Sequence, residues 1–359
     1  MSTLSPQVPT AKQHFHILDG LRGVAALSVV CFHFMEVVYS DYSKDFIGHG
    51  FLAVDFFFCL SGFVIAYAYD SRIGKMSLGS FIKARLIRLH PMVVMGSVLA
   101  IIGFIFDPIA PLGGVYGAGK TALIFLCGIL MIPYPVVAER WFNLFNLNAP
   151  AWSLFWEYIA NIIYALVLYR INRKWLIIPT LLAAVGICYM AKVSGNVMGG
   201  WSGGTFWDGG IRIAYSFLAG MLIFRYNIII KNKLGFIGVA ALLMLAFISP
   251  FSTWNWLTEP FIVIIYFPLI VALGAGAVLS PKLTNICIFS GDISYPLYMT
   301  HYTFIWMFAN YNAKFKPTIA QLSYIIPISM LLLLGIAWLV MVAYDTPVRR
   351  YLNKKRASA

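Results

Sequence analysis

Long apolar runs, separated by short polar segments, recur along the whole chain, and each run approaches the length of a membrane-spanning helix. A helix needs about 20 mainly apolar residues to cross the hydrocarbon core of a bilayer. Eleven runs qualify, over residues 22–40, 50–69, 89–107, 121–138, 151–169, 175–193, 211–226, 234–251, 261–279, 293–312 and 321–344. The pattern predicts an all-α fold, a polytopic transmembrane helical bundle.

Basic residues between the runs reduce the predicted number of crossings to about ten. Lys and Arg concentrate in the cytoplasmic loops of membrane proteins, and here they cluster in residues 70–88 and 170–174 and in the C-terminal tail. An even number of spans must separate two cytoplasmic loops, but three runs lie between the first two clusters. We expect residues 121–138, which contain the proline-rich sequence IPYPVV, to be re-entrant or interfacial. Both termini are then cytoplasmic.

Composition supports the membrane class and one membrane domain. Hydrophobic residues make up 61% of the chain and charged residues only 11%, whereas charged residues make up about a quarter of a soluble protein. The positive-inside bias accounts for the net charge of +13, so we expect a lipid bilayer and no nucleic acid as partners. The five cysteines are not spaced like a zinc site, and we predict no metal. The expected divisions are a cytoplasmic segment 1–20, a membrane domain 21–346 and a basic tail 347–359.

Several ionisable residues lie inside the predicted spans, where each is costly unless it faces water or the protein interior. They occupy one layer, from mid-depth toward the outer end, and are His33, Glu36, Asp55, Glu157, Arg212 and His301. Their recurrence in several spans predicts a functional site. Plainer interpretations stay open, because a lone intramembrane histidine often only packs. Asp55 and Arg212 can form a structural pair, and Glu36 can simply face a water-filled vestibule.

The first run carries a cation and an imidazole on one helix face. Arg22 and His33 are eleven positions apart, which is close to three full helical turns and a rise of about 16 Å. One face therefore presents Arg22 at the membrane surface and His33 near mid-depth.

Five short motifs follow one another along the chain. They are LDGLRGVAALSVVCFHF with Arg22 and His33, VDFFFCLSGFVIA with Asp55 and Ser61, FIKARLIRLHP with Arg85 and Arg88, APAWSLFWEY with Trp152, Ser153 and Glu157, and GDISYPLYMTHY with Ser294, Tyr295, Tyr298 and His301. In this order they resemble the motifs of the bacterial integral-membrane acyltransferase family 3, and the resemblance covers essentially the whole chain.

The resemblance implies a multi-pass O-acyltransferase of the bacterial cytoplasmic (inner) membrane. Such enzymes move an acyl group, here expected to be acetyl, from cytoplasmic acyl-coenzyme A to a glycan. The acceptor is a hydroxyl of a surface polysaccharide, a lipopolysaccharide or a lipid-linked glycan precursor. No permanently bound cofactor is expected, since acyl-coenzyme A is a substrate. The chain resembles the short members, which lack an added soluble esterase-like domain.

Acyl transfer to a hydroxyl needs a base, and His33 suits that task because imidazole titrates near neutral pH. We expect Glu157, or alternatively Asp55, to orient it as the acid of a catalytic triad does. Direct transfer and an acyl-histidine intermediate both stay open.

The donor and acceptor sites complete the predicted site. Arginine suits phosphate, and Arg22, Arg85 and Arg88 are expected to bind the phosphates of the coenzyme. The expected substrate pocket consists of Ser61, Trp152, Ser153, Arg212, Tyr298 and His301. The alternative function is a proton-coupled secondary transporter or flippase that moves a glycan or a small polar solute through a histidine–carboxylate relay.

Overall fold

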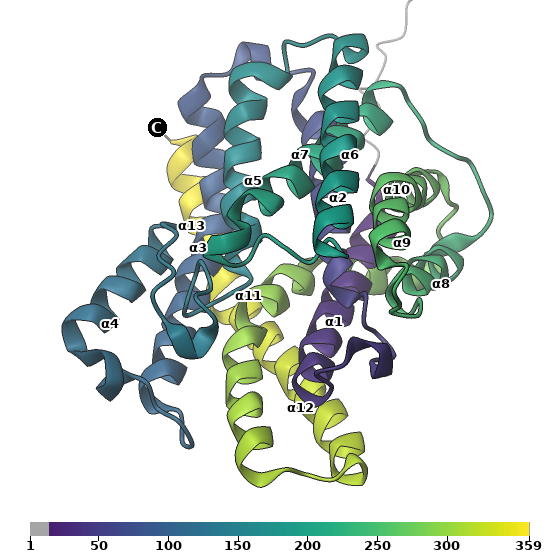
Figure 1. Ribbon diagram of the computed structural model, residues 1–359. Helices are drawn as coiled ribbons and strands as arrows, with labels where there is room; N and C mark the ends of the chain where they lie inside the picture. Colours follow the sequence, from purple (N-terminus) through teal and green to yellow (C-terminus); the bar gives the residue numbers. More distant parts are fainter. Residues whose placement is uncertain (1–13, 359) are drawn as a thin grey trace, which may run out of the picture.

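The regular elements of residues 14–358, the part of the chain that the computed structural model describes, are helices (Figure 1). They are α1 (His16–Val38), α2 (Ala53–Tyr69), α3 (Leu78–Phe106), α4 (Gly113–Ile129), α5 (Ala151–Ile163), α6 (Arg173–Ser194), α7 (Phe206–Arg225), α8 (Gly235–Phe247), α9 (Asn255–Phe261), α10 (Phe267–Gly276), α11 (Thr284–Phe315), α12 (Ile319–Val340) and α13 (Thr346–Ala357). The all-α fold is confirmed.

Seven helical segments of the described chain are long and apolar enough to span a bilayer by themselves. They are His16–Val38, Gly50–Tyr69, Leu78–Phe106, Ala151–Leu168, Arg173–Ser194, Asn255–Gly276 and Ile319–Ala357. The other three predicted spans correspond to α7, α8 and α11. Helices α7 and α11 carry buried polar residues, and α8 is short. A polytopic helical bundle is confirmed.

The ends of three helices do not coincide with the predicted divisions of the chain. Helix α1 begins at His16, inside the expected segment 1–20, of which residues 1–13 lie outside the described residues. Helix α3 begins at Leu78, because the Ser77 side chain accepts a hydrogen bond from the backbone N–H of Ser80 (3.1 Å). Its basic residues are therefore helical rather than part of a loop. The tail 347–359 continues the helical path of α12 as α13.

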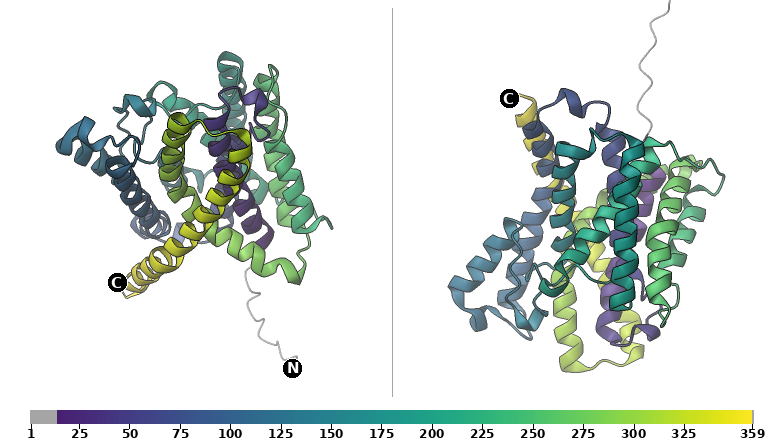
Figure 2. Two further views of the ribbon diagram at one scale, coloured as in Figure 1. Left: turned by 90° about the horizontal axis from the view of Figure 1, so that it is seen from below. Right: turned by 45° about the horizontal axis from the view of Figure 1, so that its top comes forward.

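The segment predicted not to cross the membrane is a peripheral helix followed by irregular chain. Helix α4 ends at Ile129, short of the predicted limit of residue 138, because Met131 adopts a positive φ of 56° and two prolines follow. It lies against α3 at the edge of the bundle (Figures 1 and 2). Residues 130–150 then return to the bundle and lead into α5.

The C-terminus, the α2–α3 connection and the first turn of α1 lie at one end of the bundle, which we term the basic end (Figure 1). Helices α1 and α11 run in parallel away from it, since Gly23 faces Ser290 and, farther along, His33 stacks on His301. Helices α2 and α7 also pack closely. A Cβ atom on Gly62 would lie 1.9 Å from the carbonyl oxygen of Phe217, so only glycine permits this approach.

Candidate active site

A cavity lies toward the basic end and is lined by three arginines. Arg22 comes from α1, and Arg85 and Arg88 come from α3. We term it the arginine cavity. Within the described chain, the only carboxylate that lines it is Glu157 of α5, which accepts hydrogen bonds from Arg85 Nη2 (3.2 Å) and Ser61 Oγ (3.0 Å). Cationic groups outnumber the single anion, so the cavity is suited to an anionic ligand.

A second, larger cavity lies toward the opposite end and is rich in aromatic side chains. We term it the aromatic vestibule. Its aromatic lining consists of Phe32, Tyr42, Phe51, Trp141, Trp152, Trp201, Tyr298, Tyr302 and Trp306. The polar lining residues include His33, Glu36, Arg212 and three asparagines. Apolar walls with a few placed polar groups are typical of a small-molecule site.

His33 lies in the wall of the vestibule and is held on several sides. Its Nδ1 atom lies 2.5 Å from Glu36 Oε1, one helical turn farther along α1. The His301 ring stacks on it at 5.4 Å, and the Tyr302 ring meets it edge-on at 5.0 Å. With Nδ1 bonded to a carboxylate, the other ring nitrogen remains for substrate, which is the arrangement of a histidine base.

Tyr42 of the α1–α2 loop also contacts the Glu36 carboxylate. Its hydroxyl donates to Glu36 Oε2 (3.4 Å). Burial, together with the adjacent Glu36 carboxylate, raises the pKa of Tyr42 above its usual range, so the hydroxyl stays protonated and available as a donor.

Asp55 and Arg212 form a buried ion pair between α2 and α7. Arg212 Nε donates to Asp55 Oδ1 (3.1 Å) and Nη2 to Oδ2 (2.6 Å), while Nη1 donates to the carbonyl of Gly199 (2.7 Å). Asp55 is fully buried and Arg212 is 1% exposed. The bidentate geometry uses both carboxylate oxygens of Asp55. The contacts of Asp55 therefore match a structural pair with Arg212.

The two cavities meet at a single pair of side chains. Among the described residues, Val54 and Tyr298 alone line both. The Tyr298 hydroxyl is hydrogen-bonded to Ser153 Oγ at 2.8 Å, and its ring meets the Phe57 ring edge-on. These two side chains therefore lie between the arginine cavity and the vestibule that contains His33, and we term their position the junction.

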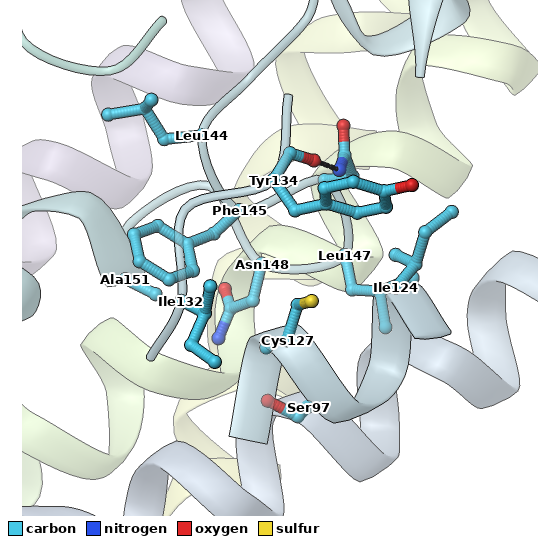
Figure 3. Close-up of a pocket in the computed structure, with 12 residues that line it drawn as sticks. Ser97, Ile124, Cys127, Ile132, Tyr134, Leu144, Phe145, Leu147, Asn148 and Ala151 are labelled. Atoms are coloured by element: carbon cyan, nitrogen blue, oxygen red, sulfur yellow. Dashed lines mark hydrogen bonds between the residues drawn. The ribbon is translucent and has the colours of Figure 1, made fainter. Parts of the chain in front are cut away.

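The irregular segment 130–150 forms one wall of the vestibule, and polar side chains bind several of its backbone groups. The Asn146 side chain accepts from the N–H of Val137 (3.1 Å) and donates to the carbonyl of Tyr134. Asn148 donates to the carbonyl of Met299 in α11 (2.9 Å). Figure 3 shows residues of this segment around a small cavity beside Ser97 of α3. Irregular backbone at membrane depth is tolerated where it is buried in protein or lines a cavity.

The comparisons with known proteins decide the family. The sequence profile of the acyltransferase 3 family, described as an acyltransferase domain, matches residues 15–343. This chain belongs to the acyltransferase 3 family. It is a multi-pass membrane acyltransferase, and the two cavities are therefore candidate substrate sites.

Two relatives of this acyltransferase align with about half of its chain. Over 162 residues, 43% of the chain, it is 38% identical to "Protein 2 in picA locus" of Rhizobium radiobacter, of which 82% is covered. Over 167 residues, 44% of the chain, it is 29% identical to "Acyltransferase MdmB" of Streptomyces mycarofaciens, of which 40% is covered. The match therefore spans less than half of the second relative. No solved structure gives a significant match.

The acyltransferase brings most of the predicted site residues to the two cavities. Arg22, Ser61, Arg85, Arg88, Ser153 and Glu157 line the arginine cavity, His33, Trp152 and Arg212 line the vestibule, and Tyr298 lines both. His301 is fully buried and lines neither cavity, because it packs behind His33. Glu157 and Asp55, which were expected to orient His33, are hydrogen-bonded to Arg85 and Arg212 in this structure. Glu36 is bonded to His33 instead.

Sequence reasoning missed the aromatic path of the vestibule. The Tyr302 ring lies 5.9 Å from that of Trp306, which lies 5.5 Å from the exposed indole of Trp141. Trp141 and Phe142 both have a positive φ of 51°, an uncommon conformation for bulky residues. The i, i+3 spacing of His33 and Glu36 was the available signal for their pairing, whereas the path to Trp141 joins distant segments and had none.

We expect Asp55→Asn to destabilise the acyltransferase by about 3–5 kcal/mol, because it leaves the buried Arg212 without its counter-charge. Thermal unfolding of the purified protein in detergent measures the effect. Asp292→Asn, at an exposed carboxylate on α11, is the matched control and should change stability by less than about 0.5 kcal/mol. Equal unfolding temperatures for the two variants would contradict a structural role for the Asp55–Arg212 pair.

Proposed function

We propose that this acyltransferase moves a short acyl group, acetyl in the simplest case, from acyl-coenzyme A in the arginine cavity to a sugar hydroxyl in the aromatic vestibule. The observation that carries the proposal is the meeting of the two cavities at Val54 and Tyr298, with phosphate-binding side chains on one side and His33 on the other. The coenzyme and the acceptor thus approach from opposite ends of the bundle.

The charges of the arginine cavity support coenzyme A as the donor. Arg85 shares Glu157 with Ser61, whereas Arg88 has no carboxylate within ion-pair distance in the described chain. Arg22 has only a loose contact with Asp19, at 3.9 Å. Such guanidinium groups can bind phosphates in bidentate fashion. The positive-inside bias puts this end in the cytoplasm, where acyl-coenzyme A is made.

The aromatic path supports a sugar acceptor. Tyr302, Trp306 and Trp141 present successive rings from the vicinity of His33 to the rim of the vestibule. A sugar ring has apolar C–H faces that pack on aromatic rings and hydroxyl groups at its edge. Asn143, which also lines the vestibule, offers an amide to such hydroxyls.

In the proposed reaction, the acceptor hydroxyl oxygen attacks the thioester carbon as His33 removes the hydroxyl proton. The carbon–sulfur bond then breaks, and the coenzyme thiolate takes that proton from the imidazolium, which yields the ester and free coenzyme A. Glu36 is the positioning residue: it holds the imidazole ring and stabilises its charged form. Direct transfer fits the geometry because donor and acceptor meet at the junction at the same time.

We expect His33→Ala to lower acyl transfer by about 10²–10⁴-fold while the protein remains inserted, because it removes the base. Glu36→Gln should lower kcat with the donor KM unchanged, and Glu36→Asp should restore part of the rate. Incorporation of a radiolabelled acetyl group into membrane glycan measures both. The matched control is Glu139→Gln, an exposed carboxylate that lines neither cavity. Retention of more than about a tenth of the rate in His33→Ala contradicts the assignment.

Arg85→Ala and Arg88→Ala should raise the donor KM more than they lower kcat, because they are proposed to bind phosphates remote from the reacting carbon. Initial rates over a range of acetyl-coenzyme A concentrations separate the two parameters. Arg350→Ala removes an exposed arginine of α13 at the same end of the bundle and is the matched control. A loss confined to kcat would assign these arginines to the transition state instead.

Uniformly oriented vesicles test the proposal as a whole. We expect product when acetyl-coenzyme A is offered only on the side of Arg88 and the glycan acceptor only on the other side. Turnover that requires both substrates on one side would move the acceptor site to the basic end. Movement of glycan across the membrane without consumption of acetyl-coenzyme A would favour the transporter alternative.

A further inference from the structure

We infer that Val54 and Tyr298 form a constriction, here called the gauge, that admits unbranched acyl groups and excludes branched ones. The inference rests on the proposed function and deepens it, because it assigns the acyl specificity of the reaction to two side chains. In the proposed reaction the acyl group leads the thioester out of the arginine cavity. It must therefore pass between Val54 and Tyr298 before the carbonyl carbon reaches the hydroxyl beside His33.

The gauge is narrow because both of its sides are buried. Val54 and Tyr298 are each 6% exposed, although both side chains line the two cavities. Space opens on either side of the pair, so the junction is the place where the size of a passing group matters. An acyl chain that has passed it lies in the wide vestibule.

The gauge is also stiff, so it cannot open for a wider group without cost. The Tyr298 hydroxyl is hydrogen-bonded to Ser153 (2.8 Å), and its ring packs at 5.8 Å from that of Phe57. Val54 lies in the first turn of α2, directly before Asp55, whose carboxylate is bonded twice to Arg212. A β-branched side chain has little rotamer freedom in a helix, and well-packed interiors resist small displacements.

A width limit distinguishes acyl groups by branching rather than by chain length. A straight chain keeps one cross-section along its length, so acetyl, propionyl and butyryl groups fit equally. Isobutyryl has the same atoms as butyryl, but its extra methyl group lies beside the carbonyl carbon. The end of the pantetheine arm next to the sulfur is unbranched and can follow the acyl group into the junction. One misplaced methyl group in a close-fitting site costs about 10–200-fold in kcat/KM.

The test compares kcat/KM for isobutyryl- and butyryl-coenzyme A in native membranes, measured as radiolabelled acyl group incorporated into glycan. Val54→Ala should raise the isobutyryl-to-butyryl ratio by at least about tenfold. Two other valines are matched controls, because Val64 lines only the arginine cavity and Val29 only the vestibule. The same truncation at either should leave the ratio within about twofold of wild type, since neither lies in the junction.

Two further variants keep the test decisive if Val54→Ala fails to insert. Val54→Ile adds a methylene and should lower the ratio, whereas Val54→Thr keeps the shape of the side chain and should leave it unchanged. A ratio that does not move at position 54, or that moves equally in the Val64 and Val29 variants, overturns the gauge and leaves the proposed function intact. Failure of the wild-type protein to use any acyl-coenzyme A overturns the proposed function itself.

Discussion

A charged side chain inside a membrane must be paired or must face water, and this constraint organises the interior of the bundle. Asp55 and Arg212 join α2 to α7, and His49 lies 3.3 Å from Glu259 with both side chains fully buried. These pairs connect segments far apart in the sequence, so they act as cross-links of the helices. His33 and Glu36 are paired as well, but they line a cavity. The distinction separates charges that hold the structure from charges available to a substrate.

The backbone obeys the same constraint in residues 130–150. Unpaired peptide groups are costly away from water, and an irregular segment within the bundle has no helix to satisfy them. The Asn146 side chain replaces those partners for Val137 and Tyr134, and Arg140 donates to the carbonyls of Asn146 (2.7 Å) and Leu147 (3.2 Å). The segment can then carry Trp141 and Asn143 to the vestibule, a placement that a regular spanning helix would not allow.

The parallel course of α1 and α11 sets the depth of the reaction. Arg22 and His33 lie on one helix, about 16 Å apart along its axis, and α11 places Tyr298 at the level between them, with His301 behind His33. The difference in depth between Arg22 and His33 is thus determined by the helical rise, which is constant. In the proposed reaction, a coenzyme held at the basic end needs to extend only its pantetheine arm, and neither the coenzyme nor the glycan crosses the bilayer.

The sequence by itself determined the helical spans, the class of protein and most of the residues that line the two cavities. Hydrophobic run length and helical periodicity are local properties, so Arg22 and His33 could be placed on one face from their spacing alone. The distribution of basic residues required an even number of crossings, and it therefore predicted that residues 121–138 do not cross the membrane. Which ionisable side chains pair with one another was decided only by the tertiary structure. Any of several carboxylates at similar depth could have met His33, and depth says nothing about which helices are neighbours. The close approach of α2 and α7 at Gly62 brings Asp55 to Arg212, while the position of α3 beside α5 brings Arg85 to Glu157. Glu36 is left to His33, and Val54 meets Tyr298 at the junction, because contacts between helices depend on three-dimensional packing and not on sequence distance.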